Sequence, residues 1–330
     1  MDDSNETTFP VINATIQSIF LNHNYIPYGA YENIIQDIPT LSFPKDIPTQ
    51  SRRFKRKTWF FIGGYSKDWY VGLAIVDAGY LAKAFCYIYD TKNKKLIEDE
   101  ITVPFGFEKN FDPGFNNTWK IKNYSIVASE NKVIAEVNTK KFTLKIDLKN
   151  NTAGISCFCP SETKRPFHYT YKNLLLDGAF ELKINGRSKI YQNMKFGLDF
   201  SKGFPPRHTF WNWASFQGKC EDGKEVGINL VDGFNSNLEN IIWYANNSIL
   251  TKDVKFSYSK PLDKSNWHVS NQELELTLTP QGARNENINL LIIKSKFTQV
   301  FGEINGKFLI DGYWKKITGF GVMEEHEAKW

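Results

Sequence analysis

Residues 70–89 read Tyr-Val-Gly-Leu-Ala-Ile-Val-Asp-Ala-Gly-Tyr-Leu-Ala-Lys-Ala-Phe-Cys-Tyr-Ile-Tyr. Two runs of β-branched, aromatic and small residues flank the turn-forming Asp77-Ala78-Gly79, a pattern that predicts a strand, a tight turn and a second strand. The stretch is the longest apolar one in the chain, but it contains Asp77 and Lys83. A charge at the centre of a bilayer costs about 2.5–3.5 kcal/mol, so this stretch is not predicted to span a membrane.

The same alternation of short apolar runs and polar turns continues along the chain after about residue 59. Asn-Gly is a strong hairpin signal, because both turn positions need a positive φ. Since roughly eight antiparallel strands suffice to close a barrel around side chains or one small ligand, we predict an all-β fold of two antiparallel lipocalin-like barrels or strongly curved sheets. The turn signals are Asp177-Gly178, Asn185-Gly186, Asp222-Gly223, Asp232-Gly233, Asn305-Gly306 and Asp311-Gly312.

The N-terminal segment differs from the rest, because five prolines interrupt it and its periodicity is weak. Residues 12–21 and 30–38 are its best helix candidates, so we expect a short, partly helical arm. The polar, proline-flanked segment from Pro160 to Pro166 is a typical domain boundary. The predicted division is therefore an arm at 1–55, a first barrel at 56–163 and a second barrel at 164–330.

The overall composition is that of a folded globular chain. Of the 330 residues, 15% are aromatic and 41% are apolar, which supplies a packed core and excludes disorder. The acidic N-terminus lacks the features of a signal peptide, and we expect a cytoplasmic protein without integral membrane contact. The oligomeric state is left open.

The net charge of +5 is mild, and the one basic cluster is Arg52-Arg53-Phe54-Lys55-Arg56-Lys57. A site for phosphate or anionic lipid is one interpretation of this cluster; a solvated lead-in to the strand beginning near Thr58 is the favoured one. No nucleic-acid motif accompanies it, so nucleic acid is not an expected partner.

The four cysteines lack the paired spacing of a structural zinc site. We therefore predict no metal and no cofactor, and expect free thiols, with Cys86 filling the core. The cysteines are Cys86, Cys157, Cys159 and Cys220.

The densest chemistry lies at residues 197–216, where Pro205-Pro206 makes a rigid corner before a strand. On that strand Arg207, Trp211 and Trp213 share one face with Thr209 and Ser215, while His208, Phe210, Asn212 and Ala214 share the other. A guanidinium beside two indoles needs a carboxylate, and Asp199 is the candidate. Two interpretations stay open: a ligand-binding wall, or an Arg–Asp clasp that pins the corner. The ligand-binding candidates are Asp199, Arg207, Trp211, Asn212 and Trp213.

The C-terminus carries Glu324 and His326 two residues apart, so a final strand points both to one face. A carboxylate–imidazole pair performs general acid–base chemistry, although a surface hydrogen bond is the commoner role. The candidate catalytic residues are Asp199, Glu324 and His326, with Asp232 as a further buried-acid candidate.

These stretches resemble the bacterial family called domain of unknown function 2804. The resemblance covers most of the chain after about residue 55, and His208 falls at a position where the family pattern varies. The matching residues are Lys57-x-Trp59, Tyr169 to Asn173, Asp199, Gly203, Pro206-Arg207, Thr209, Trp211 to Ala214, Gly218, Gly223, Gly227-x-Asn229-Leu230, Phe301-Gly302, Asp311-Gly312, Gly319, Gly321 and Glu324-x-His326-x-Ala328-x-Trp330.

The resemblance implies distant kinship with double lipocalin-like (calycin) proteins, which handle isoprenoid or lipid-like molecules, but fold alone does not fix function. The leading hypothesis is a protein that binds a hydrophobic, lipid or isoprenoid-like small molecule in a barrel or in a pocket between barrels. The alternative is a hydratase, cyclase or isomerase that uses general acid catalysis. A carbohydrate-binding β-sandwich with exposed tryptophans is the third hypothesis. The absence of a nucleophile–base motif and of a phosphate loop disfavours a hydrolase or NTPase.

Overall fold

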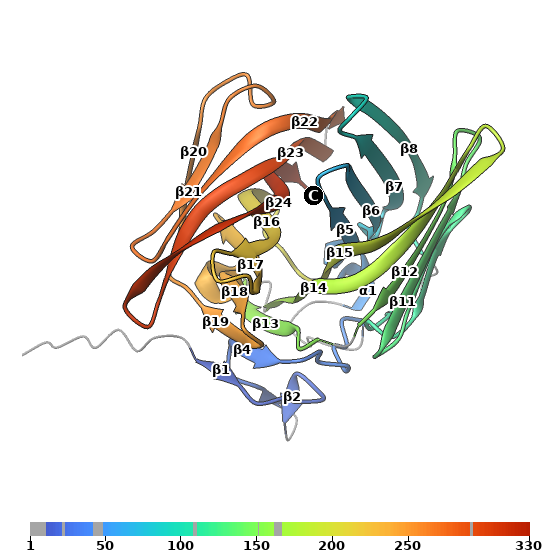
Figure 1. Ribbon diagram of the computed structural model, residues 1–330. Helices are drawn as coiled ribbons and strands as arrows, with labels where there is room; N and C mark the ends of the chain where they lie inside the picture. The colour runs from blue at the N-terminus through green and yellow to red at the C-terminus, as the bar shows by residue number, and fades with distance from the viewer. Residues whose placement is uncertain are drawn as a thin grey trace, which may run out of the picture.

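The computed structural model describes residues 11–21, 24–41, 49–107, 111–150, 152–161, 167–290 and 293–330. These residues form two strongly curved β-sheets that stand side by side, as Figure 1 shows, and pairing within both is almost entirely antiparallel. The predicted all-β, lipocalin-like architecture is therefore confirmed.

The first sheet is a nearly closed barrel of thirteen strands among the described residues. Its main path runs β8-β7-β6-β5-β15-β14-β12-β11-β10-β9, and β13, β4 and β1 extend it from β14. The strands are β1 (Ile12–Asn13), β4 (Gly29–Glu32), β5 (Lys57–Tyr65), β6 (Trp69–Asp77), β7 (Leu81–Asp90), β8 (Lys95–Pro104), β9 (Thr118–Ile121), β10 (Tyr124–Ala128), β11 (Lys132–Asn138), β12 (Thr143–Lys149), β13 (Ile155–Pro160), β14 (Phe167–Ile184) and β15 (Arg187–Gly203).

The second sheet is a half-barrel of nine described strands in the order β19-β18-β17-β16-β24-β23-β22-β21-β20. A single 3₁₀ turn, η1 (Ser236–Glu239), lies between β17 and β18. The strands are β16 (His208–Cys220), β17 (Glu225–Asp232), β18 (Ile241–Tyr244), β19 (Asn247–Leu250), β20 (Lys255–Tyr258), β21 (Trp267–Ser270), β22 (Leu274–Leu290), β23 (Ile293–Ile310) and β24 (Tyr313–Lys329).

The chain changes sheets at the proline corner, between the end of β15 at Gly203 and the start of β16 at His208. The sequence placed the domain boundary earlier, at residue 164. However, β14 pairs with β12 and β15 pairs with β5, so both strands complete the first sheet. The change of sheet therefore falls later than the predicted boundary, and the domain limits themselves stay a prediction.

The two Asn-Gly signals have different outcomes. Asn185 and Gly186 form the predicted β14–β15 turn, with φ values of 51° and 78°. The hairpin predicted at Asn305-Gly306 is wrong, because both residues lie inside β23 and pair with strands on either side. Gly306 instead allows β22 and β23 to approach each other closely, because a Cβ at this position would lie 2.1 Å from the Glu275 carbonyl oxygen. The turn comes at Asp311-Gly312.

The N-terminal arm contains strands where the sequence favoured helices. Residues 12–21 include β1 and part of the small hairpin of β2 (Phe20–Leu21) and β3 (Asn24–Tyr25), and residues 30–38 begin in β4. Because β4 pairs with β13, tertiary pairing overrides the weak helical pattern. The helix of the arm is α1 (Thr49–Lys55), which is later than predicted.

The basic cluster is not a solvated lead-in, because Arg52, Arg56 and Lys57 are buried. Arg56 contacts Asp77 at 2.5 Å and Asp112 at 3.2 Å. These ion pairs fasten the C-terminal end of α1 to the first barrel, so most of the cluster's charge serves the fold and not a phosphate or lipid site.

The interior of the first barrel is filled with side chains. The Trp119 ring packs against Phe60 and Phe200, with ring centroids 6.1 Å and 5.7 Å apart. Cys86 lies in the same core cluster, as predicted. None of the residues lining the pocket described below belongs to this cluster.

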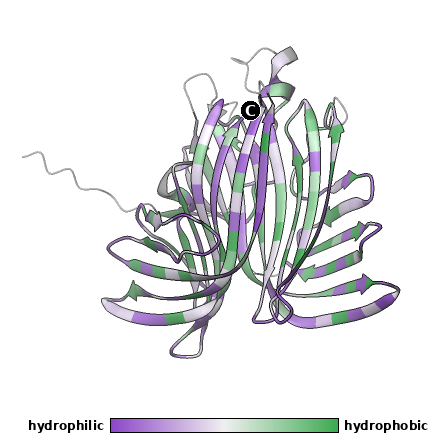
Figure 2. Ribbon diagram, turned by 90° about the horizontal axis from the view of Figure 1, so that it is seen from above, coloured by the Kyte–Doolittle hydropathy of each residue, from purple (hydrophilic) through white to green (hydrophobic). Residues whose placement is uncertain are grey.

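The outward face of β5, β6 and β7 contacts the second sheet and is aromatic. Phe301 of β23 lies against Tyr70, Tyr87 and Tyr89, with ring centroids 5.1, 5.9 and 4.6 Å apart. Buried side chains thus join the two sheets and form the base of the functional site. Figure 2 shows that α1 and the C-terminus lie at the same end of the molecule. No helix in the described part of the chain is long and apolar enough to cross a membrane.

Candidate functional site

A cavity of about 370 Å³ lies between the two sheets, beside the aromatic contact. Strands β5, β6, β7, β14 and β15 contribute one side, and β16, β22, β23, β24 and the η1 region contribute the other. Of the two locations that the sequence left open, the crevice between the sheets is the one that contains this pocket.

Aromatic side chains form a large part of its walls. Trp211 and Trp213 line the pocket from β16 because they lie two residues apart on one face of that strand. The Trp213 ring meets Phe61 of β5 edge-on at 5.7 Å, and its Nε1 donates to Asn229 Oδ1 at 2.9 Å. The other lining rings belong to Trp59, Tyr80, Phe85, Phe234, Phe297 and Trp330.

Glu324 of β24 lies in this wall with only 6% of its surface exposed. Its Oε1 accepts a hydrogen bond from Trp211 Nε1 at 3.1 Å, and its Oε2 accepts one from Gln299 Nε2 at 2.9 Å. The strand pairing explains the arrangement, since Glu324 is opposite Trp213 on one side and opposite Gln299 on the other. Tyr87 in turn donates to Gln299, and burial raises the pKa of Tyr87 well above its usual value.

His326 stands beside Glu324, as the two-residue spacing predicted. Its Nδ1 lies 3.5 Å from Glu324 Oε1, and its Nε2 lies 3.0 Å from Ser295 Oγ. Its ring packs at 4.2 Å from the Trp211 ring. Ser295 Oγ donates to Glu286 Oε1 at 3.2 Å.

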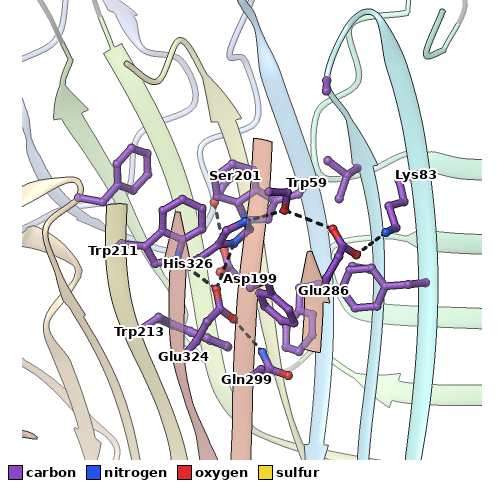
Figure 3. A pocket seen from close by; sticks show the side chains of 18 of the residues that line it. Trp59, Lys83, Asp199, Ser201, Trp211, Trp213, Glu286, Gln299, Glu324 and His326 are labelled. Atoms are coloured by element: carbon purple, nitrogen blue, oxygen red, sulfur yellow. Dashed lines mark hydrogen bonds and ion pairs between the residues drawn. The ribbon is translucent and has the colours of Figure 1, made fainter. Parts of the chain in front are cut away.

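Glu286 continues this chain of polar contacts to Lys83, whose ammonium bonds to its carboxylate (Figure 3). Burial raises the pKa of Glu286, but the bond from Lys83 and the charges of Lys83 and Arg284 outweigh it and lower the pKa. Glu286 therefore belongs to the site as an ionised carboxylate. A polar relay runs from Glu324 through His326, Ser295 and Glu286 to Lys83.

A second ionic cluster lies on the side of the first barrel. Lys172 Nζ contacts Asp199 Oδ2 at 2.5 Å and Glu239 Oε2 at 3.3 Å. Burial alone lowers the pKa of Lys172, but the two carboxylates reverse this and raise it. Burial also raises the pKa of Glu239, more than Lys172 lowers it. Asp199 further accepts a hydrogen bond from Ser201 Oγ at 3.0 Å.

Three of the predicted site residues lie elsewhere. Arg207 is exposed at the start of β16, and Asp199 pairs with Lys172 in its place, so the proposed Arg–Asp clasp is wrong. Asn212 points to the other face of β16, where it donates to Tyr258 Oη at 2.9 Å. Asp232 is half-buried and bonds to Lys255 at the end of β17. None of the three is among the described residues that line the pocket.

The sequence reasoning missed the residues that complete both clusters: Lys172, Glu239, Glu286, Ser295 and Gln299. One signal was available in β22, β23 and β24, where polar residues occupy alternate positions that a buried sheet face fills with apolar ones. The partners themselves were not predictable, because they come together only through the pairing of β22 with β23 and β24. Among the described residues no group of three or more His, Cys, Asp or Glu side chains is arranged to hold a metal ion.

A family comparison matches residues 36–330 to the family described as domain of unknown function, DUF2804. The chain belongs to the DUF2804 family. This match confirms the resemblance that the motifs around Trp211 and Glu324 suggested. No curated protein matches the chain.

Solved structures share the fold of this DUF2804 protein at low sequence identity. Kievitone hydratase from Nectria haematococca is 14% identical with a TM-score of 0.56, covering 81% of this chain and 88% of its own. An AttH candidate from Nitrosomonas europaea is 16% identical with a TM-score of 0.53, covering 82% and 92%. CghA with Sch210972 is 10% identical with a TM-score of 0.50, covering 82% and 87%. These similarities show the two-sheet fold alone.

Proposed function

We propose that this protein binds an apolar, ring-containing or isoprenoid-like small molecule between its sheets and moves a proton on it with Glu324 and His326. One observation carries the proposal: a buried carboxylate beside a partly buried imidazole faces a cavity whose lining includes many aromatic rings. Small-molecule sites are typically apolar hollows of roughly 300–1,000 Å³ with a few polar groups, and the cavity of about 370 Å³ is of that kind.

The hydrogen-bond pattern supports a transferable proton. Ser295 Oγ donates to Glu286, and we therefore assign the hydrogen of the Ser295–His326 contact to His326 Nε2. Lone pairs on His326 Nδ1 and Glu324 Oε1 then face each other at 3.5 Å unless one proton lies between them. We infer that the pair shares this proton and exchanges it with the ligand.

Addition of water to a carbon–carbon double bond illustrates the chemistry. The pair gives its proton to one alkene carbon as the π electrons form the new C–H bond. The oxygen of water bonds to the other carbon, and the proton that this water loses returns to the pair. General acid–base catalysis of this type contributes about 10²–10⁴-fold to a rate.

The similarity in fold to kievitone hydratase supports this reaction class as an analogy, and only as an analogy, at 14% identity. Isomerisation and cyclisation use the same proton transfer to or from carbon. The carbohydrate hypothesis gains no support, because Trp213 is buried and Trp211 is half-buried, so neither is the exposed indole that the hypothesis requires.

The test begins with native mass spectrometry of the protein purified from its own host, to detect a co-purifying apolar molecule. An apolar extract of the same cells is then incubated with the protein in D₂O and analysed by mass spectrometry. We expect a few apolar metabolites to change mass with the wild type and not with Glu324→Gln. Glu136→Gln, which changes the same charge on the exposed surface of β11, should behave like the wild type.

Binding without any conversion would leave a carrier and refute the catalytic step. Absence of both a co-purifying molecule and a converted metabolite would refute the proposal.

A further inference from the structure

The cations at the β7–β22 end of the pocket are already paired with carboxylates. Lys83 bonds to Glu286 and lies 3.1 Å from Glu100. Arg284 lies 2.9 Å from Glu100 and 3.2 Å from Glu98, and its guanidinium packs over the Phe85 ring at 4.1 Å. These two cations thus share three carboxylates.

The other cations of the pocket are paired as well. Lys172 holds both Asp199 and Glu239, and Lys294 contacts Glu327 at 2.7 Å. No cation that lines the pocket, among the described residues, therefore lacks a carboxylate partner.

One further cation, Lys57, lies 4.7 Å from the ring centroid of Tyr80, outside the lining. Its ammonium donates to the backbone oxygens of Phe54 and Ala78, at 2.6 and 2.8 Å. It also lies 5.9 Å from the ring centroid of Trp330.

Among the described residues that line the pocket, carboxylates and cations are equal in number. The carboxylates are Asp199, Glu239, Glu286 and Glu324, and the cations are Lys83, Lys172, Arg284 and Lys294. Glu98, Glu100 and Glu327, outside the lining, are further partners of these cations. The lining therefore offers a ligand no surplus of positive charge.

We infer that the pocket rejects anionic ligands and takes an uncharged molecule that donates a hydrogen bond, such as an alcohol or a phenol. This inference rests on the proposed function and specifies its ligand class. A ligand carboxylate entering the cavity loses its water, meets no unpaired cation and lies near ionised carboxylates. A hydroxyl group instead finds an acceptor, because Glu324 Oε2 accepts one hydrogen bond, from Gln299, and has a lone pair left.

Matched fluorescent ligands test this selectivity. 1-Pyrenemethanol and 1-pyrenecarboxylate have the same ring system and differ at neutral pH by one charge. Fluorescence anisotropy titration should give an alcohol affinity at least about tenfold higher than that of the carboxylate, since like charges placed together in an interface are strongly unfavourable. Equal affinities, or tighter binding of the carboxylate, would overturn the inference while leaving the pocket as a binding site. Failure of both ligands to bind would overturn the proposed function and the inference with it.

Charge-removing variants provide the second measurement. Glu286→Gln releases Lys83 and Arg284 from one carboxylate, so the carboxylate ligand should gain affinity relative to the alcohol. Asp199→Asn releases Lys172 from one carboxylate and should shift the ratio in the same direction through a different strand. Glu136→Gln makes the same charge change outside the pocket and should leave the ratio unchanged. Circular dichroism verifies the fold of each variant, and an unchanged ratio in both folded pocket variants would contradict the electrostatic cause.

Discussion

Lys172 is the residue whose removal should cost the most stability at the site. Its side chain is 5% exposed, and those of its two partners, Asp199 and Glu239, are 13% and 3% exposed. Lys172→Met therefore leaves two carboxylates buried without their cation. Breaking a buried ion pair by removing one partner costs about 3–5 kcal/mol, and we expect the free energy of unfolding to fall by that amount near neutral pH.

The loss should depend on pH, because the pKa of Glu239 is already raised by burial and Lys172 is what opposes the rise. Without Lys172 this pKa rises further. Between the unfolded and folded pKa values the folded protein holds a proton that the unfolded chain has lost, so stability falls as pH rises through that window. The raised pKa of Lys172 keeps its own contribution constant well into the alkaline range. The deficit of the variant should thus be smaller at pH 5 than at pH 7.5.

Urea unfolding followed by tryptophan fluorescence at both pH values measures this deficit. Lys145→Met is the matched control, because the Lys145–Glu136 pair is 51% and 57% exposed and such pairs contribute about 0–1 kcal/mol. The double variant Lys172→Met, Glu239→Gln should recover part of the loss. A deficit below about 1 kcal/mol at pH 7.5, or one that is the same at pH 5, would refute the assignment of Lys172 as the counter-ion of this cluster.

Three further outcomes are expected. Glu324→Gln should lower turnover of a converted ligand by about 10²–10⁴-fold, measured by steady-state kinetics. Binding of 1-pyrenemethanol, measured by fluorescence anisotropy, should persist. Unchanged turnover would exclude Glu324 from proton transfer. Burial raises the pKa of Asp112, but Lys202 and Thr40 outweigh it and lower the pKa to about 2. The stability that this carboxylate contributes is present above its unfolded pKa and is lost as pH falls through about 2, a loss of roughly 2 kcal/mol that Asp112→Asn should abolish in acid unfolding curves. Val76→Phe places a ring in the pocket and should weaken 1-pyrenemethanol binding at least tenfold. Val127→Phe, on the exposed face of β10, is the control and should leave the affinity unchanged. Retained affinity in the Val76 variant would place the ligand elsewhere.

The fold was predictable because its signals are local. Each strand of residues 70–89 carries its own alternation and ends at its own turn, and the pairing of β6 with β7 follows from the shortness of that turn. The shared face of Trp211 and Trp213 follows from the two-residue period in the same way. The hairpin at Asn305-Gly306 failed because the same dipeptide also suits a position where a neighbouring backbone approaches closely, and sequence alone does not distinguish the two uses.

The ionic partners were not predictable, since their contacts depend on registers between strands that are far apart in the chain. Asp199 was correctly singled out, but its cation is Lys172 because β14 pairs with β15 so that these two residues are opposite each other. Arg207, which is nearer in sequence, begins the next sheet. Proximity along the chain does not predict an ion-pair partner where a proline corner directs the following strand into a different sheet.

The position of the pocket follows from the burial of β5 and β6 on both faces. An antiparallel sheet with one solvated face alternates polar and apolar residues, as β9 does. Strand β6 instead is almost continuously buried, which requires a second layer against its outer face. Along that face Tyr70 contacts Phe301 and fills the space between the sheets, whereas Ala74, Val76 and Ala78 are small and line the cavity. The hollow therefore exists because side-chain size decreases along one strand face, and the bulky indoles of β16 bound it from the opposite sheet.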